Sequence, residues 1–573
     1  MGVDPWQDVL TELANLRREA EEALGYPHLD IPLQLIPEEF GDVGFPAHTY
    51  SKEVGKPPQE VAEEMVTAMP PSLYVARHEA RSGYVNSFLN YPTFGERTLS
   101  SILGEGNGYG KAAPTGRRVI VEHSSVNPTG PIHVGRARNS IIGDTLYRLL
   151  EWSGLEVTRE FLVNDVGKQV LTLVWGYENL PEEELEPVER EKEDYKLVRY
   201  YRKASKMMED PKVAEEVAQV VRRFEEGDEE LRRRVRGVCE RMMRGILDTL
   251  SKLNVDFDNL FWEDQTITDG SAREVVKRLR EGGRCQEEEG ALYVDMEPYG
   301  ITGRNTRWFI TRKDGTTLYT TRDLAYHLDK FRRSDEAINV LGEDHRLEFQ
   351  QLSIALKLMK VEREVESVFY AHVGLPEGRL STRGGRVVNL DDLMDEANAR
   401  AYREVRERRE DLSEEEMRTI AEAVGIGAIR YNIVKVQPEK KILFRWEEAL
   451  SLEGQTAPFL QYSYARACGI LRKSEAIDAW DPRLLENPQE RSLLKLMARF
   501  PSVVKESAAS RRPHQMAIFA YELAKTFNLF YRDCPVLRSE EALRRVRLAV
   551  VEAFRSVLGN ALKCLGIKAL EEM

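Results

Sequence analysis

The sequence predicts an α/β fold of the doubly wound type, preceded by an α+β segment and followed by an all-α bundle. Two observations lead to this prediction. Strand-like and helix-like stretches alternate between residues 117 and 180, and strand signals disappear after about Leu393. Alternating strands and helices favour a parallel sheet with right-handed crossovers. At 573 residues the chain is too long for one hydrophobic core, so about three domains are expected.

The elements of the parallel sheet can be assigned in order. "RRVIVEH", from Arg117, predicts a buried strand, and "RARNSIIGDTLYRLLEWSG" predicts an amphipathic helix that ends at Gly154. "LEVTREFLV" and "DVGKQVLTLVWGY" repeat the pattern as a second strand and helix. Residues 181–255 form a strongly charged helical insertion. We expect the sheet to resume at "ALYVDM", "RWFITRKDGTTLYTTRDLAYHL", "AINVLGEDH" and "SVFYAHVG".

Two further segments flank the sheet. Residues 1–110 begin with a helix-like stretch and reach "LYVARHEARSGYVNSFLN", which mixes strand-like and aromatic residues, before the glycine-rich linker "GEGNGYGKAAPTG". After residue 395, stretches such as "RVRLAVVEAFRSVLGNALKCLGI" have apolar residues at helical spacing and predict a bundle. We therefore divide the chain into residues 1–110, 116–395 and 396–573.

Composition argues against several classes of protein. No run of 18 apolar residues occurs, and "MGVDPWQDVL" lacks the basic start and apolar core of a signal peptide, so neither a membrane span nor a leader is expected. The five cysteines form no CxxC pair, which argues against a zinc site and favours a reducing cytoplasm. The net charge of −14 argues against a generic nucleic-acid coat but permits a local basic surface.

The stretch "VEHSSVNPTGPIHVGRARN", Val121 to Asn139, lies at a strand-to-helix junction and predicts an anion site. A helix that begins near His133 offers unpaired N–H groups and the positive end of its dipole. Gly130 and Gly135 allow the backbone to approach a ligand closely. His133 could donate to a phosphoryl group as charge builds on it, although a single histidine in such a loop can equally be structural.

Several stretches, in order along the chain, resemble motifs of one enzyme family. "HVGR" after "NPTGPI" resembles the HIGH motif of class I aminoacyl-tRNA synthetases, and its surroundings resemble arginyl-tRNA synthetases in particular. "DGTTLYTTRDLAYH" is similar to that family's arginine-pocket segment, and "GRLSTRGGRVVNLDDLMDEA" is similar to its KMSKS loop. "GQTAPFLQYSYARACGILRK" resembles its anticodon-binding domain, and "GDVGFPAHTYSKEVGKPPQEVAEEMV" its N-terminal additional domain. The resemblance covers nearly the whole chain.

This resemblance implies a Rossmann-like class I synthetase catalytic domain between an N-terminal domain that binds the tRNA D-loop and a C-terminal anticodon-binding domain. It implies activation of L-arginine by ATP with Mg²⁺, and transfer of arginine from arginyl-adenylate to the 3′-terminal adenosine of tRNA(Arg). It also implies a monomer with no structural metal. Displacement at the α-phosphorus by a carboxylate needs alignment and charge stabilisation more than a protein nucleophile.

The resemblance also assigns roles to particular residues. The HIGH-like region comprises Val126, Asn127, Pro128, Thr129, Gly130, Pro131, Ile132, His133, Val134, Gly135 and Arg136. ATP is expected to contact Ser125, Gly130, His133, Gly135, Gly342, Asp344, Arg379, Leu380, Ser381 and Thr382. Catalysis is expected to involve His133, Gly135, Arg136, Arg379, Ser381 and Arg383.

Arginine recognition needs carboxylates, because a guanidinium presents a rigid fork of donors that paired acceptors satisfy. In this family Asp323 would bind the guanidinium, Tyr319 would pack on the aliphatic stem, and Asn127 would hold the substrate's polar backbone groups. The full set expected to bind arginine is Glu122, Asn127, Glu263, Tyr319, Asp323 and His345.

The chain departs from the family pattern where positive charge is needed. Arg136 replaces the last histidine of HIGH, and "RLS" stands where the phosphate loop usually reads "KMS". Members that lack the second loop lysine often carry a lysine at the position of Gly130. We hypothesise that Arg136 substitutes electrostatically for the missing lysine, because arginine keeps the charge. The alternative is that Arg136 points outward as an ordinary helix residue.

Other interpretations of single residues remain open. Tyr319 and Tyr326 could belong to the core, and Asp323 could cap a helix. Asp391 and Asp392, in "NLDDLMDEA", are more typical of helix caps than of catalysis.

Two alternatives remain for the whole chain. One is another class I synthetase, such as a cysteinyl or glutamyl relative, but the acidic set around Asp323 favours a cationic substrate. The other is a non-catalytic tRNA-binding paralogue, for which the changes at Arg136 and Arg379 are the supporting features.

Overall fold

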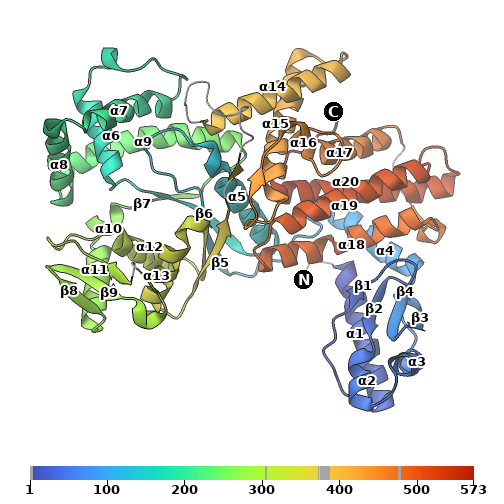
Figure 1. Cartoon of the computed structure of the whole chain (residues 1–573). Helices are drawn as coiled ribbons and strands as arrows, with labels where there is room; N and C mark the ends of the chain where they lie inside the picture. The colour runs from blue at the N-terminus through green and yellow to red at the C-terminus, as the bar shows by residue number, and fades with distance from the viewer. Residues whose placement is uncertain (1–3, 304–305, 372, 375–387, 475–478) are drawn as a thin grey trace.

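The computed structural model describes residues 4–303, 306–371, 373–374, 388–474 and 479–573 (Figure 1). An N-terminal unit lies at one end of a C-terminal helical bundle, and a parallel sheet with its helices lies on the other side of that bundle (Figure 1). The fold class predicted from the sequence is therefore confirmed, with the sheet between the two flanking units in sequence.

The N-terminal unit is an antiparallel sheet packed against helices. Its strands follow the order β1-β2-β4-β3, and α1 begins directly after Asp4, whose side chain accepts a hydrogen bond from the backbone N–H of Gln7 at 3.1 Å. The elements are α1 (Pro5–Leu24), β1 (Gln34–Leu35), β2 (Val43–Pro46), α2 (His48–Val54), α3 (Pro58–Ala68), β3 (Val75–Arg81), β4 (Tyr84–Leu89), α4 (Tyr91–Glu105) and η1 (Gly106–Gly108).

The central sheet has five parallel strands in the order β12-β11-β5-β6-β7. Its strands are β5 (Arg118–Glu122), β6 (Glu156–Val163), β7 (Asn259–Trp262), β11 (Glu336–Gly342) and β12 (Val365–Tyr370). The chain builds outward from β5 in one direction through β6 and β7, then returns to the other side of β5 with β11. The strand order thus reverses between β5 and β11, which is where open α/β sheets bind ligands.

The crossovers and the insertion are helical. Between the strands lie η2 (Val134–Arg136), α5 (Ala137–Trp152), α6 (Lys168–Asn179), α10 (Gln265–Thr268), α11 (Ser271–Glu281), α12 (Tyr319–Arg333), η5 (Glu343–His345) and α13 (Arg346–Leu358). The insertion after α6 contains η3 (Glu182–Glu184), α7 (Glu193–Met207), α8 (Pro211–Glu225) and α9 (Glu229–Lys252). Helix α9 turns Val235, Cys239 and Met242 inward, which leaves its many arginines on the outer face.

One strand assignment was wrong. "ALYVDM" and "RWFI" do not continue the parallel sheet but form a separate antiparallel sheet, β10-β9-β8, of β8 (Cys285–Glu288), β9 (Ala291–Asp295) and β10 (Arg307–Phe309), with η4 (Glu297–Tyr299) between. The physical reason is local. Glu289 and Gly290 both have positive φ, 50° and 89°, as a two-residue hairpin turn requires, and such a turn can only join antiparallel strands.

The C-terminal bundle contains the long helices of the molecule. It comprises α14 (Leu390–Arg408), α15 (Glu414–Val434), α16 (Trp446–Ala449), α17 (Ala457–Arg472), η6 (Pro482–Leu484), α18 (Pro488–Ala509), α19 (His514–Asp533) and α20 (Glu541–Leu565). One short parallel strand pair joins β13 (Val373–Gly374), at the end of the predicted strand "SVFYAHVG", to β14 (Ile442–Leu443), which lies where no strand was predicted. The buried core runs without a break from the sheet into the bundle, so the two parts pack as one body.

Candidate active site

A cavity of about 280 Å³ opens at the carboxyl ends of the parallel strands, where the strand order reverses. It receives side chains from β5, β6, β7, β11 and the first turns of α12. Eight of the residues predicted from the sequence to form the site line it, namely Glu122, Ser125, Arg136, Glu263, Tyr319, Asp323, Gly342 and His345. Residues from five distant segments therefore meet in one place.

Other predicted site residues lie outside this cavity. Asn127 is exposed and donates a hydrogen bond from Nδ2 to Oε1 of Gln169 at 3.1 Å. Asp344 is also exposed. Gly130 faces the insertion, since a Cβ on it would lie 2.7 Å from Cγ2 of Val198 in α7. Arg379, Leu380, Ser381, Thr382 and Arg383 fall outside the described residues.

The turn after β5 is held in an unusual backbone conformation. Ser124 and Ser125 have φ values of 68° and 37°, which side-chain-bearing residues rarely adopt. The backbone N–H of Ser124 donates to Oδ1 of Asn139 at 2.6 Å. The Ser125 hydroxyl donates to Oε1 of Glu122 at 3.1 Å and accepts from the N–H of Leu162 at the same distance. These bonds fix the turn at the mouth of the cavity.

The HIGH-like turn is defined by its own hydrogen bonds. Nδ1 of His133 accepts from the backbone N–H of Gly135 at 3.0 Å, which leaves the proton of the neutral ring on Nε2, free to donate. Desolvation and the nearby charge of Arg136 lower the pKa of His133, so the ring is neutral near pH 7. The next helix, α5, begins at Ala137 and points its N-terminus toward this turn.

The chain that follows the phosphate loop in sequence lies directly beside this turn. The backbone N–H of Val134 donates to the carbonyl of Val388 at 3.1 Å, and the N–H of Leu390 donates to the carbonyl of Ile132 at 2.8 Å. His133 and Asn389 form an antiparallel β-bridge. The HIGH-like turn and the first residues of α14 are therefore joined as one small piece of sheet.

A directed chain of hydrogen bonds crosses the floor of the cavity. The buried ammonium of Lys330 donates to Oδ1 of Asn339 at 2.8 Å, and Nδ2 of Asn339 contacts Nε2 of His327 at 2.8 Å. Because Asn339 donates there, the His327 proton must sit on Nδ1, which lies 2.8 Å from the backbone carbonyl oxygen of Asp323 and 3.1 Å from its Oδ1. Lys330 also forms a buried ion pair with Glu122.

Two of the three predicted acidic pocket residues are already paired inside the protein. The guanidinium of Arg322 donates to Glu263, and Lys330 pairs with Glu122. Both of these carboxylates are more than 90% buried, whereas 41% of the Asp323 side chain is exposed. Asp323 is therefore the acceptor that remains open to a cationic ligand.

Electrostatics keep Asp323 ionised. Desolvation acts to raise the pKa of Asp323, but His327, Lys330 and His345 outweigh it, so the net pKa is lowered. Burial raises the pKa of Glu263, which the bond from Arg322 opposes. A negative charge thus persists at the entrance to the pocket across neutral pH.

Aromatic side chains complete the walls. Tyr326 is core, as the simpler interpretation had it: its ring is buried, and its hydroxyl donates to Glu160 at 2.9 Å. Tyr319, by contrast, is 57% exposed at the start of α12 and lines the cavity. Sequence reasoning missed Arg322, His327 and Lys330. His327 and Lys330 lie four and seven residues after Asp323 in α12, so the helical period places both on the same face as Asp323 and could have identified them.

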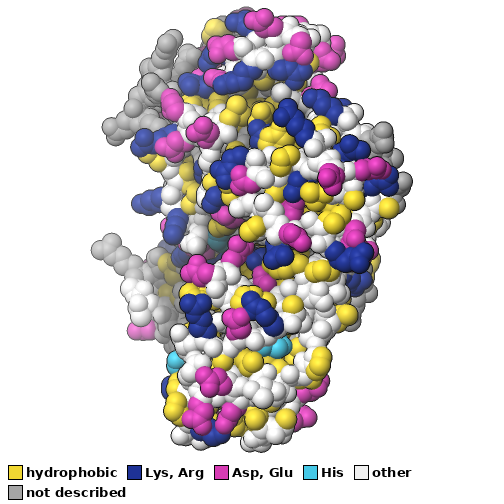
Figure 2. Space-filling view, turned by 90° about the vertical axis from the view of Figure 1, so that its right-hand side faces the viewer, with side chains coloured by type: hydrophobic (Ala, Val, Ile, Leu, Met, Phe, Trp, Pro, Cys, Tyr) yellow, Lys and Arg dark blue, Asp and Glu magenta, His cyan; other side chains and the backbone are white. Residues whose placement is uncertain are grey.

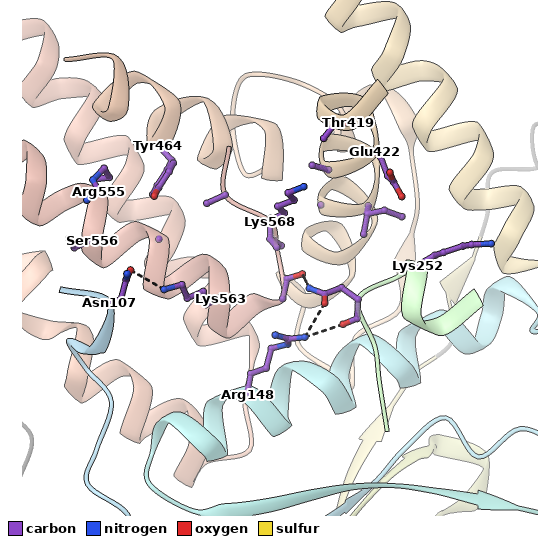
Figure 3. Close-up of a pocket in the computed structure, with 18 residues that line it drawn as sticks. Asn107, Arg148, Lys252, Thr419, Glu422, Tyr464, Arg555, Ser556, Lys563 and Lys568 are labelled. Carbon is purple, nitrogen blue, oxygen red and sulfur yellow. Dashed lines mark hydrogen bonds between the residues drawn. The ribbon is translucent and has the colours of Figure 1, made fainter. Parts of the chain in front are cut away.

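A separate cavity of about 530 Å³ lies between α5, α15, α17 and the end of α20 (Figure 3). Lys252, Lys563 and Lys568 line it from three different parts of the chain (Figure 3). Beneath it Arg148 donates to the backbone carbonyl of Asn254 at 3.1 Å. This cavity marks the junction of the sheet, the insertion and the bundle, and is remote from the strand ends.

No group of three or more His, Cys, Asp or Glu side chains suited to a metal ion occurs among the described residues. In the same part of the chain, no helix is both long and apolar enough to cross a bilayer.

Comparison with known proteins gives the same family along the whole chain. Residues 98–446 match the model of class I tRNA synthetases (R), catalytic domain. Residues 460–573 match the DALR anticodon-binding domain, and residues 11–89 match the arginyl-tRNA synthetase N-terminal domain.

Individual relatives agree with the family models. The arginine–tRNA ligase of Methanocella arvoryzae is 43% identical over 567 residues, which cover 99% of both chains. That of Methanothermobacter thermautotrophicus is 41% identical over 90% of both chains. The solved structure of Thermus thermophilus arginyl-tRNA synthetase superposes with a TM-score of 0.81 at 28% identity, over 98% of this chain and all of that one. The chain belongs to the arginyl-tRNA synthetase family of class I aminoacyl-tRNA synthetases.

Proposed function

We propose that this chain activates L-arginine with ATP and transfers it to tRNA(Arg), and that both steps take place in the cavity at the strand ends. The observation that carries the proposal is the open, ionised Asp323 among otherwise paired carboxylates. Full-length relatives named arginine–tRNA ligase support the enzyme over a non-catalytic paralogue.

Arginine binding follows from the charges in the pocket. The substrate guanidinium would donate to Asp323, whose other neighbour, His327, holds it in place from behind. Tyr319, exposed at the cavity wall, would pack on the substrate's aliphatic stem. Glu122 and Glu263 would act mainly through the electrostatic potential in the pocket, because each carboxylate already forms an ion pair, Glu122 with Lys330 and Glu263 with Arg322.

ATP would lie over the HIGH-like turn. The N-terminus of α5 and the Nε2 proton of His133 offer donors for phosphate oxygens, and Arg136 lines the cavity between that turn and the arginine pocket. Arg136 would thus stabilise the negative charge that develops on the α-phosphoryl group as the arginine carboxylate attacks and diphosphate leaves. We propose that Mg²⁺ enters on the phosphates of ATP, as it does in most nucleotide sites.

The tRNA would contact a basic groove of about 840 Å³ in the C-terminal bundle. Within it, the guanidinium of Arg466 lies between the exposed rings of Tyr462 and Tyr531, 4.7 and 4.8 Å from their centres. Cations interleaved with exposed aromatic rings are suited to unstacked bases and their phosphates. We assign this groove to the anticodon loop, and expect the chain to act as a cytoplasmic monomer.

The first experiment is charging of total tRNA with radiolabelled arginine, ATP and Mg²⁺, in parallel with lysine and glutamate. Arginine alone should be incorporated. Charging of lysine or glutamate, or of none of the three, would overturn the proposal.

A variant then tests the pocket itself. Asp323→Asn keeps the shape but removes the charge, and should lower kcat/KM for arginine about 10- to 100-fold, the cost of one charged hydrogen bond. KM for ATP should stay unchanged. The matched control is Asp329→Asn, because Asp329 lies on the same helix but pairs with Arg333 away from the cavity. Equal losses in both variants would contradict the assigned role of Asp323.

A further inference from the structure

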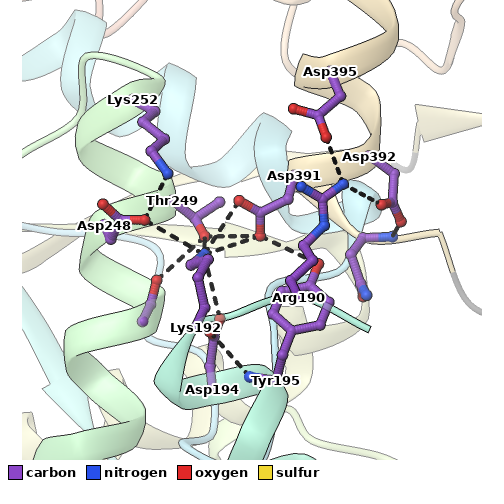
Figure 4. A network of polar contacts seen from close by, with 12 residues as sticks. Arg190, Lys192, Asp194, Tyr195, Asp248, Thr249, Lys252, Asp391, Asp392 and Asp395 are labelled. Atoms are coloured by element: carbon purple, nitrogen blue, oxygen red, sulfur yellow. Dashed lines mark hydrogen bonds and ion pairs between the residues drawn. The ribbon is translucent and has the colours of Figure 1, made fainter. Parts of the chain in front are cut away.

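The helical insertion is attached to the active site through one cluster of charged side chains (Figure 4). At its centre lies Lys192, at the start of α7, with a side chain that is 15% exposed. Its ammonium donates to both oxygens of Asp391, at 3.1 and 3.2 Å, and to the hydroxyl of Thr249 in α9 at 2.5 Å. Thr249 in turn donates to Asp391 at 3.0 Å.

Asp391 has no other cationic partner among the described contacts. It is buried, and its remaining neighbour is the hydroxyl of Tyr195 at 3.3 Å. Two further carboxylates, Asp194 and Asp248, approach Lys192 at 3.6 and 3.7 Å. Asp248 also pairs with Lys252 at 2.7 Å, so the ammonium of Lys192 compensates chiefly the buried carboxylates of Asp391 and Asp194, and its removal is costly.

A second contact runs parallel to the first. Arg190 bridges Asp392 and Asp395 on α14, at 2.7 and 2.6 Å. Asp392 also caps this helix, since its carboxylate accepts from the backbone N–H of Asn389 at 3.2 Å. The helix-cap interpretation is thus correct for Asp392, whereas Asp391 serves as the anchor for Lys192.

The anchored segment is the one that pairs with the HIGH-like turn. Asn389 forms the β-bridge to His133, and Leu390 donates to the carbonyl of Ile132. Only one residue, Leu390, separates Asn389 of the His133 bridge from Asp391 of the Lys192 ion pair. A shift at the start of α14 is therefore transmitted directly to the backbone that carries His133.

We propose that Lys192 is a positioning residue for the ATP side of the active site, acting through Asp391 and the Asn389 bridge on His133. The insertion thereby holds the HIGH-like turn in the position that binds the nucleotide. The arginine pocket on β7 and α12 shares none of these contacts, so the effect is confined to ATP. The inference rests on the proposed function for its kinetic readout only.

The test is Lys192→Met, which keeps the length of the side chain and removes its charge. In arginine-dependent ATP–diphosphate exchange, with tRNA present, kcat/KM for ATP should fall about tenfold or more, because small misplacements of a reacting group are costly. KM for arginine should remain unchanged. Lys192→Arg, which keeps a donor and a charge, should recover part of the loss.

The matched control is Lys196→Met. Lys196 lies on the same helix, and within the described part of the chain its one ion pair is with the exposed Glu191, 2.7 Å away, and none is with α14. This variant should behave like the original chain. Equal loss for ATP and arginine in Lys192→Met, or a lower melting temperature with unchanged kinetics, would overturn the inference and leave Lys192 a stabilising residue only.

Hydrogen exchange gives a readout independent of activity. The amides of Val134 and Leu390, which hold the bridge, should exchange faster in Lys192→Met, while those of β11 should not change. Unchanged protection at the bridge would contradict the mechanism. Failure of the original chain to perform the exchange reaction would contradict the proposed function instead, and these amides would still decide the inference.

Discussion

Arg136 is the residue that, in the hypothesis drawn from the sequence, substitutes electrostatically for the missing lysine of the phosphate loop. Arg136 is exposed and also lines the active-site cavity, a placement that the substitution hypothesis requires. Desolvation and the charge of Arg136 together lower the pKa of His133, so that ring is neutral near pH 7. A neutral histidine that donates from Nε2 needs a separate source of positive charge beside it, and Arg136 is placed to be that source.

Replacement of Arg136 tests whether its positive charge is needed for adenylate formation. Arg136→Ala should reduce kcat for adenylate formation about 100-fold, comparable to removing one donor that stabilises charge in the transition state. Arg136→Lys should retain more activity, because it keeps the charge and loses only the planar fork. Single-turnover formation of arginyl-adenylate is the measurement, and a rate unchanged in Arg136→Ala would refute the substitution hypothesis.

His123 makes a prediction for stability against pH. It is fully buried beneath the serine turn, and burial lowers its pKa to about 4. The unfolded chain binds the proton near pH 6.5, so the neutral ring contributes its full stability above that pH. The contribution is lost as the pH falls from 6.5 to 4, by about 1.4 kcal/mol per pH unit.

The variant His123→Gln should therefore show a flatter decline of unfolding free energy over this range than the original chain. Urea unfolding at pH 7.5, 6.0 and 5.0 measures the slope, and any constant cost of the substitution cancels in the comparison. Parallel slopes for the two proteins would show that His123 does not titrate as its burial requires.

At the scale of elements, the HIGH-like loop packs closely against α7 of the insertion. Gly130 is predicted to approach ATP, and a Cβ at this position would also lie 2.7 Å from Cγ2 of Val198 in α7. The loop and the insertion therefore pack so closely that glycine fits best between them, in the same region where Lys192 anchors α14. Packing between two elements is thus a second reason for glycine at this position.

A pair of substitutions separates this from an ATP contact. Gly130→Ala should cost about 1–3 kcal/mol of stability or reduce activity through overpacking. Adding Val198→Ala removes the opposing methyl groups and should restore most of what was lost. Thermal unfolding and exchange kinetics of both variants provide the measurement. No recovery in the double variant would indicate that Gly130 acts on the nucleotide directly.

The elements of the parallel sheet were predictable because each strand carries its own apolar run and each helix its own period. The hairpin β8–β9 was misassigned because its defining feature is the backbone of Glu289 and Gly290, which the apolar pattern does not encode. In the site, motif residues could be found from sequence. The pairings of Glu122 with Lys330 and Glu263 with Arg322 could not, because they depend on side chains that meet across different elements.

At the scale of the whole molecule, one buried arginine joins three parts. Arg430 of α15 has no exposed surface and forms an ion pair with Asp144 of α5. It also donates to the backbone carbonyls of Leu253, after the insertion, and Leu565, at the end of α20. Gly566 is required beside it, because a Cβ there would fall 2.1 Å from its Nη2. This junction lies next to the cavity of Figure 3.

Loss of that arginine should loosen the bundle from the sheet. Arg430→Met leaves Asp144 buried, with Arg148 as its remaining cation, and should cost about 3–5 kcal/mol in unfolding free energy. Arg430→Met with Asp144→Leu should recover part of this cost, since a buried pair replaced by apolar groups is often tolerated. Calorimetric unfolding measures both. A double variant no more stable than the single one would show that the backbone contacts of Arg430 outweigh its charge.

The surface shows why recognition of tRNA must be local. The chain carries a net charge of −14, and on the face seen in Figure 2 basic and acidic side chains are interspersed. The net charge and this face therefore offer no long-range attraction to guide an RNA to the molecule. In the proposed function, binding would depend on the cations gathered with tyrosines in the groove around Arg466.

The hydrogen-bond chain below the arginine pocket has a direction. Every donor in it points from Lys330 toward Asp323, and both the amide of Asn339 and the ring of His327 accept on one side and donate on the other. With an aspartate at position 339, the Asn339 link would become an acceptor on both sides and would no longer match a His327 ring that accepts at Nε2. One amide nitrogen at the wall of the cavity thus fixes which nitrogen of His327 carries the proton, and so which end of that ring faces Asp323 as a donor.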